Sequence, residues 1–593
     1  MNETIFDYIK EQEVAFQKTI QLEDGWDWCM KDHLRRSFLY KNSQFDEKND
    51  DRTLRPNKNI ILAILNIQYR TEGFDVKDIE LYVDDPDEYY KSFLVKKFHN
   101  KWALENSIDT FIDDIVVSYS DYGGVLVRDT AENRPEVIDL RSLAFCNQTD
   151  ILAYPFCIKH TFSPSQLREM DKWGKTENGA TIDLESLITL CKDEKEIVVY
   201  ELQGTLPSEW LNSVEAQGVE AQEDEKKDTQ QIQIVAYYKK QDKNEQGVTL
   251  FKHKEPKLPF KFLARDKIIG RALGRGGVEE LFESQIWTNW NEIKITEMLE
   301  AASKIIELTD DPTLAAKHPS GLKDMDNLEF VQVQEGKKGV WQMDTHPRSL
   351  VVFNDAIERW QIHAQQLGAA SEGLLGEAPS AGTPFKLYEA QNIEAKSMHR
   401  YRQGQIAVFM DEIYRDWLLP HIAKEIANDH NFLSELSADE LQEIAENMGV
   451  KKWNQYASNK ILNIEDVYPE EKQPMIEQGR QEFLKGGIKR FIKIFKNEIK
   501  KPLGVFTNIA GKQKNLALLT DKLVNVLRQF IATPQIRQDP EMVKLMNVIL
   551  ESSGLSPIMF GASSVPMAPQ GGGTEPLKQL GQGQLKSEQM AMV

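Results

Sequence analysis

Two glycine-containing stretches of the sequence have residue types that could hold an anion. The run GRALGRGG, Gly270–Gly277, precedes a helical segment, and free backbone amides at such a position can bind phosphate. The run lacks the Gly-Lys-Ser or Gly-Lys-Thr ending of a nucleotide-binding loop, and no strong strand signal precedes it. We therefore interpret Arg271 and Arg275 as arginines of a turn or of a contact between subunits.

The second stretch is the GKT at residues 174–176, which has the right ending for a nucleotide-binding loop. Glu169, however, occupies the position at which that motif requires its first glycine. We interpret the stretch as a loop after a short helix. Ser163 and Pro164 are a favourable cap and first-turn residue for that helix, which we expect to end near Trp173.

The sequence contains no recognisable set of residues for metal-dependent or nucleophilic catalysis. Its ten histidines form no HExxH pair, and it has no nucleophile elbow. The acidic runs Asp46–Asp51 and Asp84–Glu88 contain Asn, Lys or Pro, which is typical of exposed loops. A metal nuclease, in contrast, needs carboxylates held rigidly around two ions. We therefore predict no metal, no cofactor and no catalytic residue.

Length and charge narrow the possible functions. A chain of 593 residues is too long for one compact core, so we expect three or four folding units. A formal net charge of -21 argues against a large nucleic-acid-binding surface, because tight phosphate binding uses Lys and Arg. Either the protein does not contact nucleic acid, or DNA passes its surface without adhering. The simplest alternative is that acidity only keeps copies of a soluble protein apart.

Cysteine usage and hydropathy bear on the compartment. The four cysteines show no CxxC spacing and fit neither a zinc site nor a disulfide scaffold, which indicates a reducing compartment. The N-terminus has acidic residues where a signal peptide has a basic stretch, and no apolar run is long enough to span a membrane. We expect a cytoplasmic protein without an anchor of its own.

The elements that must position any site differ along the chain. The first 269 residues mix helix and strand, with helical apolar spacing near the N-terminus and over Asn59–Tyr69. The charged stretch Glu215–Gln231 is expected to be an exposed loop. Enrichment in β-branched and aromatic residues predicts the strands Gly124–Arg128, Glu136–Asp139, Ile197–Leu202 and Ile232–Tyr238.

From about Asn428 onward the pattern is nearly all helical. The predicted helices are Ala438–Met448, Gln473–Lys485, Ile488–Lys500, Leu516–Phe530 and Met542–Ile549. Ile488–Lys500 is basic and amphipathic, and we favour an apolar face packed in a helical bundle over a membrane or DNA contact. The final residues, 562–593, lack periodicity and aromatics and are expected to be disordered.

The order of segments between Gly270 and Ile426 is the most informative feature of the chain. A helix is predicted after the glycine run, apolar on more than one face, so that it must be covered on several sides. The segments that follow are two strands joined by a turn, a second helix, a loop rich in small residues and a third, long helix. Their predicted ranges are Val278–Ile306, Leu328–Val333, Glu335–Lys338, Gly339–Met343, Leu350–Leu367, Ser371–Phe385 and a helix ending near Ile426.

This order, together with the phrase EGLLGEAPSAGTPF, resembles the portal proteins of tailed bacteriophages. The resemblance implies an α+β, predominantly helical fold with a mixed wing, an antiparallel helical stem, a small strand-containing clip and a helical crown. The implied parts are the wing 1–269, first stem helix 270–306, clip 307–345, second stem helix 346–370, tunnel loop 371–386, long wing helix 387–430, crown 431–561 and a disordered tail 562–593.

The resemblance also implies a function without catalysis. Portal proteins form a homododecameric ring at one capsid vertex, through which double-stranded DNA is packaged and ejected. The implied partners are the terminase large subunit, head-tail adaptor or neck proteins, the major capsid protein and the scaffolding protein, with no membrane. The protein would be in the host cytoplasm during assembly and then in the virion. Twelve copies would carry on the order of 250 negative charges, so that a channel lined by some of them would repel the duplex and let it slide.

Three groups of site residues follow from the resemblance. The tunnel loop would meet DNA through Ser380, Gly382, Thr383, Pro384 and Lys386. Subunits would meet in the stem through Trp287, Trp290, Ile293, Phe353, Ile357 and Trp360. The clip would contact the motor and the adaptors through Asp310, Lys337, Lys338 and Trp341. The alternatives are a metal-dependent nucleic-acid-processing enzyme and a monomeric cytoplasmic scaffold protein, in which the first stem helix would be an internal core helix.

Overall fold

A computed structural model gives the fold of most of the chain. It describes residues 5–44, 57–76, 79–83, 98–130, 134–153, 155–191, 195–211, 228–239, 245–255, 257–303, 307–320, 332–337, 339–342, 350–370, 374, 397–428, 438–499 and 505–509. The chain divides into two compact units, Met1–Gly511 and Lys512–Val593. All described residues belong to the first unit.

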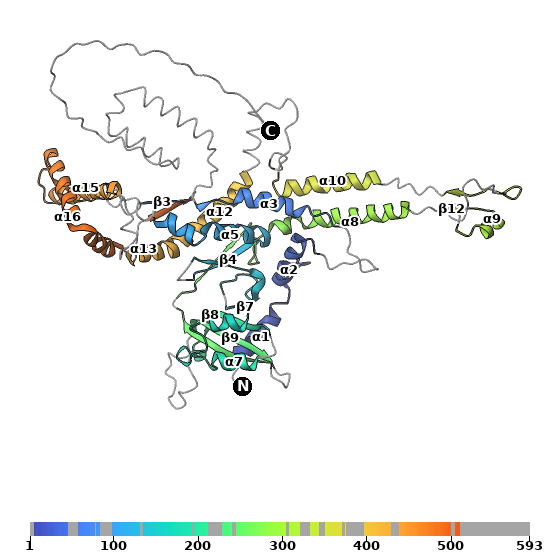
Figure 1. The fold of residues 1–593 in the computed structure, drawn as a ribbon, viewed down its shortest axis with the longest axis horizontal. Helices are drawn as coiled ribbons and strands as arrows, with labels where there is room; N and C mark the ends of the chain where they lie inside the picture. Colours follow the sequence, from blue (N-terminus) through green and yellow to red (C-terminus); the bar gives the residue numbers. More distant parts are fainter. Residues whose placement is uncertain are drawn as a thin grey trace, which may run out of the picture. The chain divides into compact units, whose positions relative to one another are not determined.

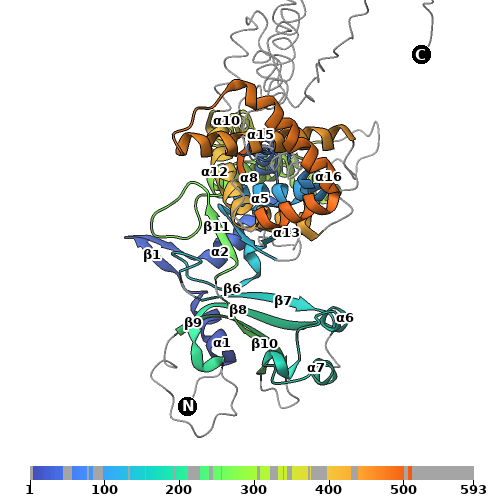
Figure 2. The ribbon, with the colours of Figure 1, turned by 90° about the vertical axis from the view of Figure 1, so that its left-hand side faces the viewer.

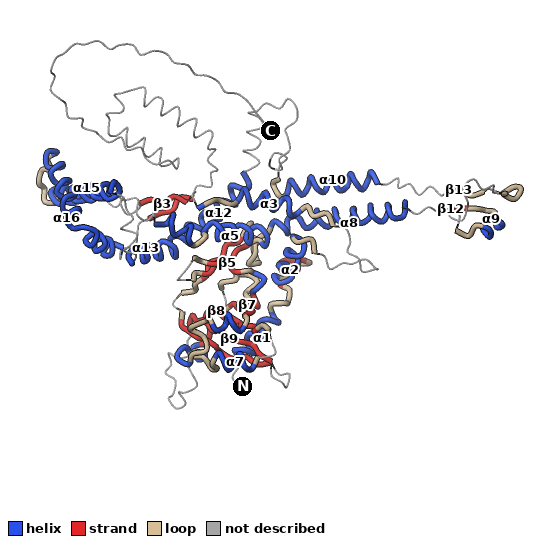
Figure 3. Tube along the Cα trace, viewed as in Figure 1, coloured by secondary structure: helices blue, strands red, loops and turns tan. Residues whose placement is uncertain are grey.

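The described residues form a mixed α+β fold with antiparallel sheets (Figures 1 and 3). The main helices are α1 Ile5–Ala15, α2 Met30–Lys41, α3 Ile61–Glu72, α5 Ile108–Tyr122, α6 Pro164–Arg168, α7 Leu184–Leu190, α8 Gly277–Ser303, α9 Pro312–Lys317, α10 Leu350–Leu367, α12 Ser397–Ile413, α13 Leu419–Asn428, α15 Ala438–Leu462 and α16 Lys472–Ile499. The strands are β1 Ile20–Glu23, β2 Trp26–Trp28, β3 Ile79–Val83, β4 Gly124–Arg128, β5 Glu136–Ile138, β6 Leu143–Phe145, β7 Phe156–Phe162, β8 Ile197–Pro207, β9 Asp228–Lys239, β10 Glu245–Lys254, β11 Phe260–Ala264, β12 Glu307–Leu308, β13 Trp341–Gln342 and β14 Val505–Ile509.

The largest sheet has the strand order β10-β9-β8-β7-β6 and is covered on both faces (Figure 2). Successive side chains of a strand point to opposite faces, so alternate residues enter different cores. Tyr200 and Leu202 of β8 pack with α1, whereas Ile197 and Val199 pack with α6 and α7. This two-sided burial explains why β8 and β9 are rich in β-branched and aromatic residues.

A second, smaller sheet has the order β11-β4-β5 and adjoins the main helical core. That core joins α5, α12 and α13 with residues of α15 and α16, such as Ile444 and Phe483. Between α12 and α13 the helix widens into the π-helical turn Tyr414–Leu418. The Lys261 amine of β11 donates to the Glu412 carbonyl oxygen at 3.2 Å and pairs with Asp416 at 2.5 Å beside this turn. The predicted long helix thus contains a π turn, which a side chain from the neighbouring sheet contacts.

Four predictions from the sequence are confirmed closely. The strand Gly124–Arg128 and the helix Leu350–Leu367 have the predicted bounds. The helix α8, predicted as Val278–Ile306, starts one residue earlier than predicted and is described to Ser303. The Ser163 cap is present as a capping box with Gln166, although α6 ends at Arg168 rather than near Trp173.

Three predictions about elements are wrong. The predicted helices Gln473–Lys485 and Ile488–Lys500 are one helix, α16, and the helix predicted to end at Met448 continues to Leu462. A strand, β11, does precede the glycine run. The strand Trp341–Gln342 lies within the predicted Gly339–Met343 and pairs with Glu307–Leu308, where α8 and α10 are connected. The predicted helices Leu516–Phe530 and Met542–Ile549, the tail 562–593 and most of Leu328–Val333 lie outside the described residues.

Candidate functional site

The helices α8 and α10 form an antiparallel hairpin that carries most of the predicted site residues. The rings of Trp287 and Trp360 stack with centroids 6.1 Å apart and planes inclined by 10°. Trp290 meets Phe353 at 6.4 Å between centroids. Residue numbers thus rise along α8 while they fall along α10, which establishes the antiparallel packing.

The side chains of α8 are distributed in an unusual way. Its buried face is apolar at the start of the helix, with Val278 and Leu281, and polar beyond it, with Ser284, Gln285, Thr288 and Asn291. Gln285 explains part of this: its amide nitrogen donates to the Lys58 carbonyl oxygen at 2.8 Å, and its side-chain oxygen accepts from the Ile60 N–H at 2.9 Å. The polar face thus binds the segment that leads into α3.

Several large apolar side chains of the hairpin, in contrast, are exposed. On α8 the exposed fractions are 42% for Trp287 and 45% for Trp290, and on α10 Val351 and Val352 are each 67% exposed. The other exposed large apolar residues of the hairpin are Ile286, Leu299, Ile362 and Leu367. We call these eight residues, which lie on more than one side of the two helices, the open apolar face. Exposed apolar surface of this extent is typical of a site of association.

The six predicted stem contacts therefore differ in their surroundings. Trp287 and Trp290 belong to the open apolar face, whereas Ile293, Phe353 and Trp360 are half-buried. Ile357 is only 4% exposed, since it packs inside the chain itself, and it offers almost no surface to a second copy.

The tip of the hairpin is organised by one carboxylate that sequence reasoning did not single out. Asp311 caps α9 by accepting from the Thr313 N–H at 2.9 Å, and its other oxygen accepts from the Gln334 N–H at 2.9 Å. The Thr313 hydroxyl also donates to it, at 2.6 Å. The hydroxyl bond and the backbone bonds together lower the pKa of Asp311 to about 2. Of the predicted tip residues, Asp310, Lys337 and Trp341 are exposed, and Lys338 lies outside the described residues.

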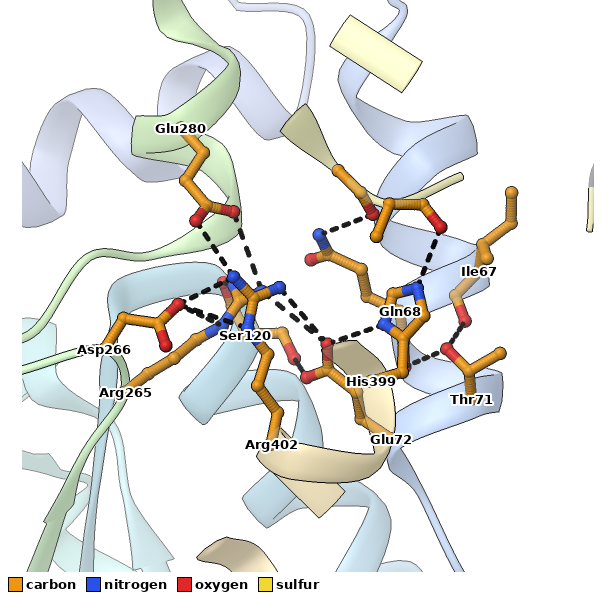
Figure 4. Close-up of polar contacts among 12 residues, drawn as sticks. Ile67, Gln68, Thr71, Glu72, Ser120, Arg265, Asp266, Glu280, His399 and Arg402 are labelled. Atoms are coloured by element: carbon orange, nitrogen blue, oxygen red, sulfur yellow. Dashed lines mark hydrogen bonds and ion pairs between the residues drawn. The ribbon is translucent and has the colours of Figure 1, made fainter. Parts of the chain in front are cut away.

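A buried cluster of charged side chains lies at the opposite end of the hairpin, where α8 begins with Glu280 in its first turn. Figure 4 shows the polar contacts of this cluster. Arg265 and Arg402 are fully buried, as is Glu72, and Asp266 and Glu280 complete the group. Arg402 donates to Asp266 at 3.1 and 2.6 Å and to Glu280 at 2.9 Å. We call these five residues, with His399, the ion cluster.

The electrostatics of the ion cluster follow from its composition. Burial raises the pKa of Glu72, but the hydrogen bond from His399 and the charges of Arg265 and Arg402 outweigh it, so that this pKa lies below its usual range. For Glu280 burial dominates and the pKa is raised despite the two arginines. Glu72 is thus held as a carboxylate by its neighbours.

The ion cluster fixes the two points between which the predicted tunnel loop runs. His399, near the start of α12, contacts Glu72 through Nδ1 and the Ala369 carbonyl oxygen through Nε2, each at 3.1 Å. Ala369 directly follows the last turn of α10. The end of α10 and the start of α12 are therefore joined through one side chain. The predicted loop residues Ser380, Gly382, Thr383, Pro384 and Lys386 lie outside the described residues.

The glycine run adjoins the ion cluster and has a structural role. A side chain at Gly274 would overlap the Arg265 carbonyl oxygen, since both backbones hydrogen-bond to the Gly123 carbonyl oxygen at 2.9 Å. Arg271 is buried, donates to the Leu273 and Gly274 carbonyl oxygens at 2.9 Å and pairs with Glu279 at 2.6 Å. Arg271 is thus a turn arginine, one of its two predicted roles, whereas Arg275 is exposed.

A second buried ion group lies in the large sheet. The Glu201 carboxylate accepts from Arg128, His160 and Gln203, each at 2.8 Å. Burial alone would raise the pKa of Glu201. The hydrogen bond with His160 and the charge of Arg128 outweigh burial and lower this pKa to about 2. Among the described residues no group of three or more His, Cys, Asp or Glu side chains is placed to hold a metal ion. The four cysteines are free thiols, and all are buried.

Comparison with known proteins assigns the chain to no family. No model of a protein family matches the sequence, and no curated protein matches it. Of the helices that the structure describes, none combines the length and the apolar character needed to cross a membrane.

Sequence reasoning missed the ion cluster entirely. Its members come from α3, α8, α12 and the β11–α8 connection, and Glu72 and His399 are 327 positions apart. One signal was present: His399 and Arg402 lie three residues apart, on the same side of α12 as the buried Ile406. Charged residues on the apolar side of a helix indicate that they form buried ion pairs with residues from another part of the chain.

Proposed function

We propose that the chain is a portal protein of a tailed bacteriophage and forms one subunit of a homododecameric ring at a single capsid vertex. Double-stranded DNA enters and leaves the capsid through the channel of that ring. The ring also docks the terminase large subunit during packaging and head-tail adaptor proteins afterwards. The chain itself does no chemistry in this function.

The observation that supports this proposal best is the open apolar face of the α8–α10 hairpin. Polar residues of α8 such as Gln285 and Thr288 are buried within the chain, while Trp287 and Trp290 remain almost half exposed. A lone globule would bury its aromatic residues first, because burial of apolar area is the main stabilising contribution to folding. In a ring, each hairpin has a neighbour on both sides, and those neighbours cover what one chain leaves open.

The two ends of the hairpin fit the same proposal. The exposed tip residues Asp310, Lys337 and Trp341 are suited to contacts with a docking partner. At the other end, the ion cluster holds both ends of residues 371–396, the part of the chain proposed to meet DNA. The 27 residues of α8 separate the two ends by roughly 40 Å at 1.5 Å per residue.

The first test is the state of assembly of the purified chain. We expect negative-stain images and mass photometry to give closed rings of about twelve copies of the 68.1 kDa chain. A particle that stays at the mass of one chain at every concentration would contradict the proposal.

The second test places a charge in the open apolar face. Trp290→Asp should prevent ring formation, because a neighbour would have to bury an unpaired carboxylate, which costs several kcal/mol. The folded chain should keep its melting temperature nearly unchanged, since Trp290 is 45% exposed. Trp26→Asp is the matched control, because Trp26 on β2 is 43% exposed and lies outside the hairpin. Unchanged rings in the Trp290 variant would place the subunit contact elsewhere.

A further inference from the structure

The connection between α15 and α16 displays a second group of apolar side chains. Ile461 is 66% exposed, Leu462 79%, Ile464 95% and Tyr468 57%. We call these four residues the corner surface. It is separate in sequence from the α8–α10 hairpin, and none of the sequence motifs includes it.

The backbone of the corner surface is strained at one residue. Ile464 has φ +60°, the left-handed region that β-branched residues rarely adopt. The Ile464 N–H donates to the Ile461 carbonyl oxygen at 3.1 Å and the Glu465 N–H donates to the Lys460 carbonyl oxygen at 2.9 Å. These two bonds define a helix end at which the residue in the left-handed position is usually glycine. Isoleucine at this position costs backbone energy and exposes an apolar side chain, so folding of the chain alone does not explain it.

The corner surface is also held rigidly. The Lys460 amine bonds both oxygens of Glu471, at 3.0 and 2.9 Å, and so bridges the two sides of the connection. Behind the corner, α15 and α16 cross closely: a side chain at Gly479 would come within 2.9 Å of the Gly449 Cα. Lys452 and Glu482 pair across the same crossing at 2.7 Å. A surface that is already rigid loses little entropy when it binds a partner.

The charges around the corner surface indicate the character of its partner. Glu465, Asp466 and Glu470 are exposed beside it, so a complementary partner is basic as well as apolar. The sequence of α16 from 488 to 499, IKRFIKIFKNEI, has this character. It carries four basic residues against one glutamate, with apolar residues at helical spacing.

The corner surface cannot meet this stretch within one chain. The helix α16 is continuous from Lys472 to Ile499, and residues 472 and 488 are roughly 24 Å apart along its axis. A helix cannot fold back on its own beginning. Contact between the two surfaces therefore requires two copies and joins different patches of each, a geometry that gives a ring when the rotation between copies closes and an open chain of copies when it does not.

We propose that the corner surface of one copy binds the basic end of α16, residues 488–499, of the next copy. This contact deepens the proposed function, on which it rests, by naming a second subunit contact besides the open apolar face. It also explains the strained isoleucine: the side chain that is unfavourable in one chain becomes buried in the assembly.

The first arm of the test uses Ile464→Gly in the full chain. Glycine relieves the left-handed backbone, so the melting temperature of the unassembled chain should stay the same or rise. The concentration at which rings form should rise by about tenfold or more, because one large aliphatic side chain no longer becomes buried. Ile269→Gly is the matched control, since Ile269 is 93% exposed and its backbone is not left-handed. Equal weakening by both variants, or none by Ile464→Gly, would overturn the proposal.

The second arm is a charge exchange that identifies the occupant. Glu465→Lys with Asp466→Lys should weaken assembly, and Lys489→Glu with Lys493→Glu should weaken it similarly. All four changes in one chain should restore it, because both sides of the contact are then reversed. Failure of the fourfold variant to recover would mean that another protein or another segment occupies the corner, which overturns the proposal. Open chains of copies whose assembly changes with the charge exchange would contradict the ring but support this contact. Rings whose assembly is unaffected by the charge exchange would support the ring and contradict this contact.

Discussion

Removal of one arginine from the ion cluster should destabilise the chain far more than removal of its neighbour. Arg402→Met keeps most of the aliphatic volume but deletes three hydrogen bonds, two to Asp266 and one to Glu280. Glu72, Asp266 and Glu280 would then share a single guanidinium, that of Arg265. Breaking a buried ion pair by removing one partner costs about 3–5 kcal/mol, since the remaining charge stays buried.

The control is on the same helix. Arg400 is exposed, two residues before Arg402, so Arg400→Met changes the same residue type without touching the cluster. Exposed substitutions of this kind alter the free energy of unfolding by about 0.5 kcal/mol or less. Both variants have the same net charge, which removes any general effect of charge.

Urea unfolding followed by far-ultraviolet circular dichroism at pH 7 measures the difference. With a slope of about 1–3 kcal/mol per molar urea, the Arg402→Met midpoint should fall by about 1 M or more relative to Arg400→Met. The double variant Arg402→Met with Glu280→Gln should recover part of the loss, because one of the carboxylates left with Arg265 is neutralised. Equal midpoints for the two single variants would refute the reasoning and leave the cluster without a stabilising role.

Two further predictions concern the other buried carboxylates. The pKa of Glu201 is lowered from 4.5 to about 2, so this group stabilises the fold above pH 4.5 and loses that contribution as the pH falls toward 2. The stability difference between the wild type and Glu201→Gln should therefore shrink by about 3 kcal/mol between pH 7 and pH 2, measured by urea unfolding, and a constant difference would contradict it. At the tip, Asp311→Ala removes the cap of α9 and the bond to Gln334, so hydrogen exchange of the amides at Thr313, Leu314 and Gln334 should accelerate while α8 and α10 stay protected. Unaltered exchange at those amides would show that Asp311 does not hold the tip together.

The elements that sequence predicted well are those with strong local patterns. The centre of the strand Gly124–Arg128, Val-Leu-Val, is apolar and buried on both faces, and Leu350–Leu367 has apolar residues at helical spacing. The edge strand β10, in contrast, has only three large apolar residues, Val248, Leu250 and Phe251, among polar and charged ones, so its composition does not distinguish it from a loop. Local patterns find elements whose partners need not be known.

The parts that sequence could not predict depend on distant segments. The strand β14 pairs with β3 from more than 400 positions away, and nothing in the sequence of either strand predicts its partner. The same holds for the ion cluster, because Arg265 and Arg402 become buried only when α3, α8 and α12 pack together. For Trp287 and Trp290 the sequence left two environments open, a subunit contact or an internal core helix, and their exposed fractions of 42% and 45% come from the structure.

The His399 bridge has a mechanical consequence. Residues 371–396 are covalently linked to the rest of the protein only through Ala370 and Ser397, and His399 couples both attachment points to Glu72. A force on residues 371–396 is therefore transmitted to the ion cluster, to which α3, α8 and α12 all contribute residues. Neither α8 nor α10 has to bear that force alone along its length.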